Sequence, residues 1–136
     1  MTPDGMIANL SKFDPKATAD RLAAAVGRRG MTILARVDHA AAARAAGMDL
    51  RPTEVLLFGN PKAGTPLMQA AQTAGIDLPL KALIWRDAEG RTWLGYNDPG
   101  RIAERHGIEG AQETIAKMRA ALAAVAREAT TDEQPI

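Results

Sequence analysis

The stretch Thr53–Pro66, TEVLLFGNPKAGTP, decides the fold that this chain is expected to adopt. After Thr53 and Glu54 it contains the four consecutive apolar residues Val55–Phe58. A strand with one wet face would alternate between apolar and polar residues, whereas a continuous apolar run is typical of a central strand covered on both faces. We therefore predict a central strand over Thr53–Phe58.

The residues after this strand predict a tight loop that leads into a helix. Gly59 and Gly64 allow backbone angles and close approaches that a Cβ atom would hinder. Pro61 ends strand pairing because it has no amide hydrogen. Thr65 is a good N-cap and Pro66 suits the first helical position, so we expect the loop to span 59–64 and the helix to begin at Thr65.

A loop that ends at a helix N-terminus predicts a pocket for an anion or a carboxylate. Such a loop offers free amide groups and positive potential, and Lys62 adds a mobile cation. The alternative is a capped strand-to-helix turn with a solvated lysine. An ATPase loop is excluded, because the glycine spacing matches only the first half of that motif and no lysine follows Gly64.

Composition describes one ordinary globular domain. The chain has 136 residues, 46% hydrophobic and 24% charged, with a formal net charge of +1. That balance creates no global field for nucleic acid or membrane, so we expect neither partner. The absence of cysteine excludes disulfides and thiolate chemistry. Because no secretory signal or membrane-length apolar run is visible, we expect a cytoplasmic protein.

The pattern of strand and helix signals predicts a single α+β domain over residues 1–129, with a disordered C-terminal tail over 130–136. Expected strands are 5–11, 31–37, 53–58, 80–86 and 91–96. Expected helices are 15–27, 40–46, 66–75, a short one from Pro99 to His106, and 110–128. In the second strand we expect Ile33, Ala35 and Val37 on one face, and Leu34 and Arg36 on the other.

These elements predict a two-layer antiparallel sheet with two long helices, near 15–27 and 110–128, on one face, and short helices in the connections. The second face remains apolar, with Trp85 and Trp93 brought together by a hairpin. It needs cover from the helix after Pro66, from a ligand, or from another subunit. We predict a homodimer that buries second-face residues.

Four motifs occur in order along the chain: VDHAAAA at 37–43, FGNPKAGTP at 58–66, IDLPLK at 76–81, and YNDP at 96–99. Together they closely resemble the family named domain of unknown function 302, over roughly residues 6–129. The resemblance implies a small α+β domain of TATA-binding-protein-like topology, usually a homodimer. It implies no reaction and no cofactor.

Polar residues of these motifs stand near strand ends, beside loops that connect a rigid sheet, where sites are often found. The predicted ligand-binding residues are Asn60, Lys62, Gly64, Thr65, Asp77 and Asn97. Simpler roles compete with these: Thr65, Asp38 and Asp98 suit helix capping, and Asn60 suits a turn. No metal site is predicted.

His39 is the leading catalytic candidate, with Asp38 or Tyr96 as its orienting partner. In the first turn of a helix the macrodipole disfavours a protonated imidazole, which leaves a neutral base, hydrogen-bond partner or ligand. The competing role is a histidine fixed by a backbone carbonyl. The chain's single serine, Ser11, does not stand in a nucleophile elbow, so the sequence argues against a Ser-His-Asp hydrolase.

Three functions follow from these patterns. The first is a dimeric, non-catalytic module that binds a small ligand or an anion. The second is an enzyme that uses His39 as general acid or base. The third is a purely structural interaction domain. No residue pattern identifies a reaction or a substrate.

Overall fold

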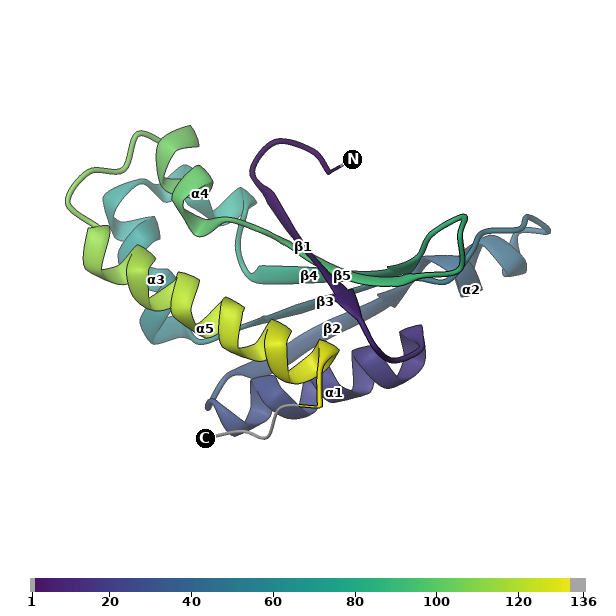
Figure 1. The fold of residues 1–136 in the computed structure, drawn as a ribbon. Coiled ribbons are helices and arrows are strands. Elements are labelled where there is room, and N and C mark those ends of the chain that lie inside the picture. The colour runs from purple at the N-terminus through teal and green to yellow at the C-terminus, as the bar shows by residue number, and fades with distance from the viewer. Residues whose placement is uncertain (1, 133–136) are drawn as a thin grey trace.

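The fold is described by a computed structural model, which covers residues 2–132 (Figure 1). The strands are β1 (Met6–Ser11), β2 (Thr32–Asp38), β3 (Thr53–Gly59), β4 (Leu80–Arg86) and β5 (Thr92–Asn97). The helices are α1 (Pro15–Arg28), α2 (His39–Ala45), α3 (Pro61–Ala70), the 3₁₀ turn η1 (Gln72–Ile76), α4 (Pro99–Arg105) and α5 (Gln112–Thr130).

The five strands form one antiparallel sheet in the order β1-β5-β4-β3-β2. The two long helices, α1 and α5, pack against one another and along one face of this sheet (Figure 1). The predicted two-layer α+β class is therefore confirmed. The run 55–58 lies in β3, which pairs with a strand on each side.

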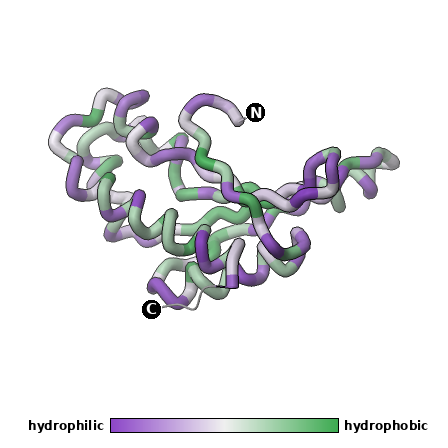
Figure 2. Tube along the Cα trace, viewed as in Figure 1, coloured by the Kyte–Doolittle hydropathy of each residue, from purple (hydrophilic) through white to green (hydrophobic). Residues whose placement is uncertain are grey.

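The core lies between the sheet and the two long helices. Leu56 and Phe58 of β3 are fully buried there, together with Leu22 of α1 and Leu122 of α5. The backbone colours of Figure 2 show the same arrangement, with apolar segments gathered in the middle of the sheet. α1 starts where its sequence signal predicts, because the Asp14 carboxylate accepts a hydrogen bond from the Ala17 amide at 2.7 Å.

The expectation that Ile33 shares a face with Ala35 and Val37 is wrong, because the strand contains a β-bulge. Ile33 lies opposite Phe58, but Ala35 lies opposite Leu57, so Leu34 is an extra residue in the ladder. Each residue after an inserted one changes face. Ile33 therefore faces the helices, whereas Ala35 shares the opposite face with Leu57.

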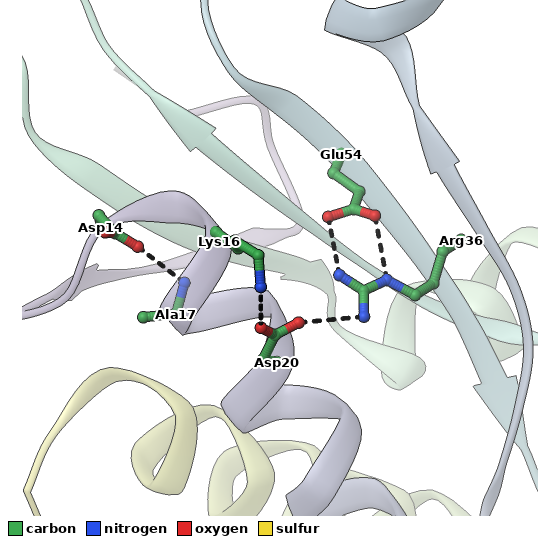
Figure 3. Close-up of polar contacts among 6 residues, drawn as sticks. All are labelled: Asp14, Lys16, Ala17, Asp20, Arg36 and Glu54. Carbon is green, nitrogen blue, oxygen red and sulfur yellow. Dashed lines mark hydrogen bonds and ion pairs between the residues drawn. The ribbon is translucent and has the colours of Figure 1, made fainter.

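The same bulge turns Arg36 toward the helices, where it joins β2 to β3 and α1 (Figure 3). Its guanidinium donates to the Glu54 carboxylate at 3.0 and 3.2 Å and to Asp20 of α1 at 3.3 Å. Lys16 also contacts Asp20, at 2.7 Å. Hydrogen bonds from Lys16 and, to a smaller extent, Arg36 hold the pKa of the Asp20 carboxyl below its ordinary value. The network fixes the edge strand to the first helix.

The face of the sheet opposite α1 and α5 is called the open face below. In Figure 1, α2 projects from one end of the sheet and α3 and α4 lie at the other, so none of the helices in residues 2–132 crosses this face. Strand register and the alternation of side chains assign these apolar residues to it: Met6, Ala8, Leu10, Ala35, Val37, Val55, Leu57, Leu83, Trp85 and Trp93. Leu10 is 53% exposed and Val37 41%.

The two tryptophans stack on the open face. Trp85 and Trp93 are direct register partners, with ring centroids 6.4 Å apart and an interplanar angle of 20°. Gly95 makes this arrangement possible, because a Cβ atom there would lie 3.1 Å from the Trp85 ring and clash with the end of Met6. The Trp93 indole donates to Asp87 at 2.8 Å, and this bond is the main reason that the pKa of the Asp87 carboxyl is lowered.

α5 continues through Thr130, one residue past the predicted end of the domain, and Thr130 is buried with its hydroxyl bonded to the Ala126 carbonyl. Residues 133–136 of the predicted tail lie outside the described residues.

Asp98 joins the short helix α4 to α5. Its carboxylate caps α4 by accepting from the Gly100 amide at 3.1 Å, and it receives two hydrogen bonds from Arg119 at 2.8 and 3.1 Å. The Arg119 guanidinium is the main cause that lowers the pKa of Asp98 below 3.8. The ionised carboxylate is therefore favoured in the folded state.

This contact predicts a pH-dependent loss of stability in the Asp98→Asn variant. Asn retains the cap but not the ion pair, so we expect a loss of about 1 kcal/mol at pH 7. Because the pKa of Asp98 in the folded protein lies below 3.8, the contact with Arg119 stabilises the fold at pH values above 3.8. This stabilisation is lost as the pH falls through the folded-state pKa of Asp98. Urea unfolding at pH 7 and pH 2.5 measures it. The matched control is Asp14→Asn, a cap with no ion pair recorded within residues 2–132. An equal effect of both variants at pH 7 would contradict the account.

Candidate functional site

The largest of the three cavities described for residues 2–132 lies at the end of the sheet where β3 leads into α3 and β4 begins, and we call it the sheet-end pocket. Its volume is about 760 Å³, within the range of known ligand sites. β2, α3 and α5 supply most of its wall. It is lined by Arg29, Met31, Thr32, Leu34, Gly59, Asn60, Pro61, Lys62, Ala63, Gly64, Thr65, Met68, Leu78, Pro79, Leu80, Thr114, Lys117, Met118 and Ala121.

The start of α3 differs from its prediction. The helix begins at Pro61 rather than Thr65, so residues 61–64 are helical rather than a loop. Asn60 is the N-cap, and its side chain accepts from the Lys62 amide at 2.9 Å. Asparagine caps as well as threonine, and Pro61 suits the first helical position as well as Pro66 does. Pro66 lies inside the helix, at the expense of one backbone hydrogen bond.

This earlier start removes the predicted cradle of free amides. The amide of Lys62 bonds to the Asn60 side chain, and those of Ala63 and Gly64 bond to the Asn60 carbonyl at 2.9 and 3.1 Å. The amides in the first turn of α3 are thus already occupied. Any attraction for an anion must come from side chains.

The floor of the pocket is apolar and its edge is basic. Leu80 and Met118 are 8% and 4% exposed, so they form the buried floor. α5 presents Thr114, Lys117, Met118 and Ala121 at helical spacing, on one face. The charged residues that line the pocket are Arg29, Lys62 and Lys117, and none of the lining residues is acidic. The site is suited to an apolar group that carries negative charge.

Four of the predicted ligand-binding residues lie together in this pocket, and two do not. Asn60, Lys62, Gly64 and Thr65 line it. Asp77 instead binds His106, whose Nε2 lies 2.6 Å from its Oδ2, and Arg105 at 2.9 Å. Asn97 is exposed at the end of β5, opposite Met6.

The catalytic candidates are separated. Asp38 caps α2 by accepting from the Ala41 amide at 2.9 Å, and His39, next to it, is exposed. Tyr96 lies in β5 and is 7% exposed in the core. β3 and β4 stand between β2 and β5, which makes a separation of roughly 14 Å at about 4.8 Å per strand. Burial raises the pKa of the Tyr96 phenol, which weakens it further as an acid.

The described chain also contains a polar cluster that connects η1 to α4. His106, with a side chain 7% exposed, contacts Asp77 through Nε2 and the Thr73 hydroxyl through Nδ1 at 2.9 Å. The side chains of this polar cluster line none of the three cavities described for residues 2–132. Those residues contain no group of three or more histidine or carboxylate side chains that could hold a metal ion.

Sequence reasoning missed the apolar lining of the pocket. Met31, Met68 and Met118 come from three separate segments, and a methionine at a helical position is equally typical of a core. Arg29 and Lys117 were also missed, because isolated basic residues carry no signal of their own. Of the four sequence motifs, FGNPKAGTP supplies most of the polar lining, and IDLPLK supplies Leu78, Pro79 and Leu80.

Comparison with known proteins identifies the family. The family described as domain of unknown function DUF302 matches residues 7–125. The structure is similar to the crystal structure of an uncharacterized conserved DUF302 protein from Bacillus stearothermophilus, with a TM-score of 0.84 over 93% of this chain and 99% of that one. The sequence identity is 19%, so this likeness concerns the fold.

Curated relatives share more of the sequence but are longer. The chain is 45% identical over 104 residues to a protein named Fluoride-specific ion channel FluC 1 from Brucella suis biovar 1 (strain 1330). The match covers 76% of this chain and 41% of that protein. The protein of the same name from Brucella abortus biovar 1 (strain 9-941) matches at 45%, over 38% of its length. The chain thus spans about two fifths of these relatives. None of the helices in residues 2–132 has the length and apolar character to cross a membrane.

Proposed function

The chain belongs to the DUF302 family, and we propose that it is a non-catalytic module that holds a small ligand in the sheet-end pocket and works as a homodimer. The observation that carries the proposal is the pocket itself. Its volume of about 760 Å³ suits a small organic molecule, and a few polar groups stand beside a mainly apolar wall.

The pocket lining supports binding rather than catalysis. It contains no histidine, cysteine, serine, tyrosine or carboxylate, so it lacks the side chains that most often act as general base and has no pairing of a serine or cysteine nucleophile with a histidine base. The alternative enzyme, built on His39, lacks support because His39 is exposed at the far end of the sheet and lines none of the cavities described for residues 2–132.

The proposal does not extend fluoride conduction to this chain. The relatives that carry the channel name are matched over only about two fifths of their length. Fluoride is small and strongly hydrated, and thioether and methyl groups cannot replace the water around an ion. The wall formed by Met31, Met68 and Leu80 therefore favours a ligand with an apolar body.

The first test occupies the pocket with a larger side chain. Ala121 lies on the α5 face that lines the pocket, so the larger side chain of Ala121→Phe fills part of the cavity. Phenylalanine is tolerated inside helices, so α5 should be retained. Nile red, a neutral apolar dye, serves as the probe in fluorescence titrations. We expect one dye per wild-type chain and at least about tenfold weaker binding to the variant, the equivalent of about 1.4 kcal/mol.

The matched control is Ala120→Phe, one residue away on an exposed position outside the pocket. It should bind Nile red as the wild type does, and urea unfolding should report that both variants are folded. Unchanged dye binding by folded Ala121→Phe would contradict the pocket proposal.

The homodimer proposal rests on the open face. Five strands about 4.8 Å apart, each about six residues long at about 3.3 Å per residue, present a plane of roughly 20 by 20 Å. A patch of that size is comparable with the largest apolar patch on a typical monomer, and such a patch is often functional. A second copy is the occupant we propose, because a two-fold axis covers the face twice with one set of residues. The stacked Trp85 and Trp93 supply the large aromatic contacts typical of interfaces.

Two residues of β1 give a matched test of the dimer. Leu10 lies on the open face and is 53% exposed, whereas Ile7 is 41% exposed on the helix side of the same strand. Leu10→Lys should shift the mass from dimer to monomer in light scattering at micromolar concentration, because it buries a charge in the interface. Ile7→Lys should remain a dimer. A wild-type monomer, or equal effects of the two variants, would contradict the proposal.

A further inference from the structure

Resting on the proposed ligand pocket, we infer that its ligand is an amphipathic anion, with one anionic head at the basic edge and a flexible apolar chain on the methionine-lined floor. The edge and the floor are independent observations. The first concerns charge and the second concerns the shape and mobility of the lining side chains.

The edge of the pocket collects cations from three separate elements. Arg29 follows the end of α1, Lys62 lies in the first turn of α3, and Lys117 lies in α5. No carboxylate lines the pocket to neutralise them. Converging positive charge with no carboxylate in the same lining attracts an anion.

The two lysines are available to a ligand, whereas Arg29 has a carboxylate partner outside the pocket. Lys62 has no hydrogen-bond or ion-pair partner for its amine within residues 2–132. Arg29 forms an ion pair with Glu128 at 3.7 Å, through the oxygen that Arg28 does not contact, so it is shared between this carboxylate and a ligand. Lys117 contacts Glu113 at 3.5 Å in a pair with both side chains largely exposed, which contributes little.

The floor is lined by flexible rather than rigid side chains. Three of the six methionines in the chain, Met31, Met68 and Met118, line this one pocket. Unbranched thioethers adjust to ligands of irregular or variable shape. The pocket contains no aromatic side chain for a planar ring to stack on. A flexible aliphatic chain fits this lining better than a ring system does.

A bare inorganic anion fits the pocket poorly. The first-turn amides of α3 are occupied by Asn60, so the backbone offers no cradle for a phosphate or sulfate. The cations stand at the exposed edge, where water and salt screen them. Binding of an anion here therefore also requires burial of an apolar part of the ligand.

The test compares three ligands that share a ten-carbon chain and differ in the head group. Decanoate, decyl phosphate and decanol are titrated, below micelle-forming concentrations, against the complex with Nile red. We expect at least one of the two anions to displace the dye at a concentration roughly tenfold lower than decanol, as one charge-assisted contact implies. The difference between the two anions identifies the preferred head group. Raising the salt concentration should weaken the anions more than the alcohol.

Charge-removing variants assign the head group to the basic edge. Lys62→Met and Lys117→Met keep an apolar stem and lose the charge, so each should weaken anion binding about threefold to tenfold without weakening decanol. Lys12→Met, on an exposed lysine outside the pocket, is the control and should change nothing.

The outcomes separate this inference from the proposed function. If decanol displaces Nile red as well as both anions do, the pocket is retained and the anion inference is overturned. If the lysine variants leave anion binding unchanged, the inference is also overturned. If no ligand displaces the dye, and Ala121→Phe leaves dye binding unchanged, the proposed function itself fails.

Discussion

The extra residue at Leu34 is the constraint on which the two surfaces of the sheet depend. Without it, β2 would carry Ile33, Ala35 and Val37 on the same face. With it, Ile33 packs over Phe58 and Arg36 reaches Glu54 and Asp20, while Ala35 and Val37 join the open face. A one-residue shift in a ladder reverses every later side chain, so the bulge changes the composition of both faces at once. Leu34 itself, 59% exposed, lines the sheet-end pocket.

The buried core and the candidate binding surfaces lie in different parts of the molecule. The helix side of the sheet holds the buried core, with Leu22, Leu56, Phe58 and Leu122 inaccessible or nearly so. Ion pairs at the edges of that layer hold helices in position, as Arg36 does for α1 and Asp98 for α4. In the sheet-end pocket and on the open face, by contrast, several apolar side chains are not covered by other parts of residues 2–132. Apolar surface that is left uncovered in a stable domain is the usual mark of a binding surface.

The sequence predicted the fold well because its strongest signals are local. The apolar run Val55–Phe58, the proline-containing caps and the amphipathic pattern of the last helix each depend on neighbouring residues. The bulge was missed because nothing in TILARVD distinguishes an inserted residue from a regular alternation. The start of α3 was misplaced because Asn60-Pro61 and Thr65-Pro66 are equivalent capping signals, and tertiary packing selects between them.

The site was predictable only in part, for a physical reason. Lys62 stands in a conspicuous motif, but Arg29 and Lys117 reach the same pocket from helices distant in the chain, which only folding brings together. The contact between Asp77 and His106 spans 29 residues and has no sequence signal either. Such long-range convergence is the part of a site that local patterns do not contain.

The central claim is that the sheet-end pocket holds the ligand, and methionine methyl NMR tests it most directly. The methyl groups are labelled with ¹³C and assigned by single Met→Leu variants. On titration with decanoate, the signals of Met31, Met68 and Met118 should shift together and show contacts to the ligand chain. Met6, on the open face, and Met48, beside another cavity, should stay unchanged. Shifts at Met6 or Met48 with the three pocket signals unmoved would contradict the account.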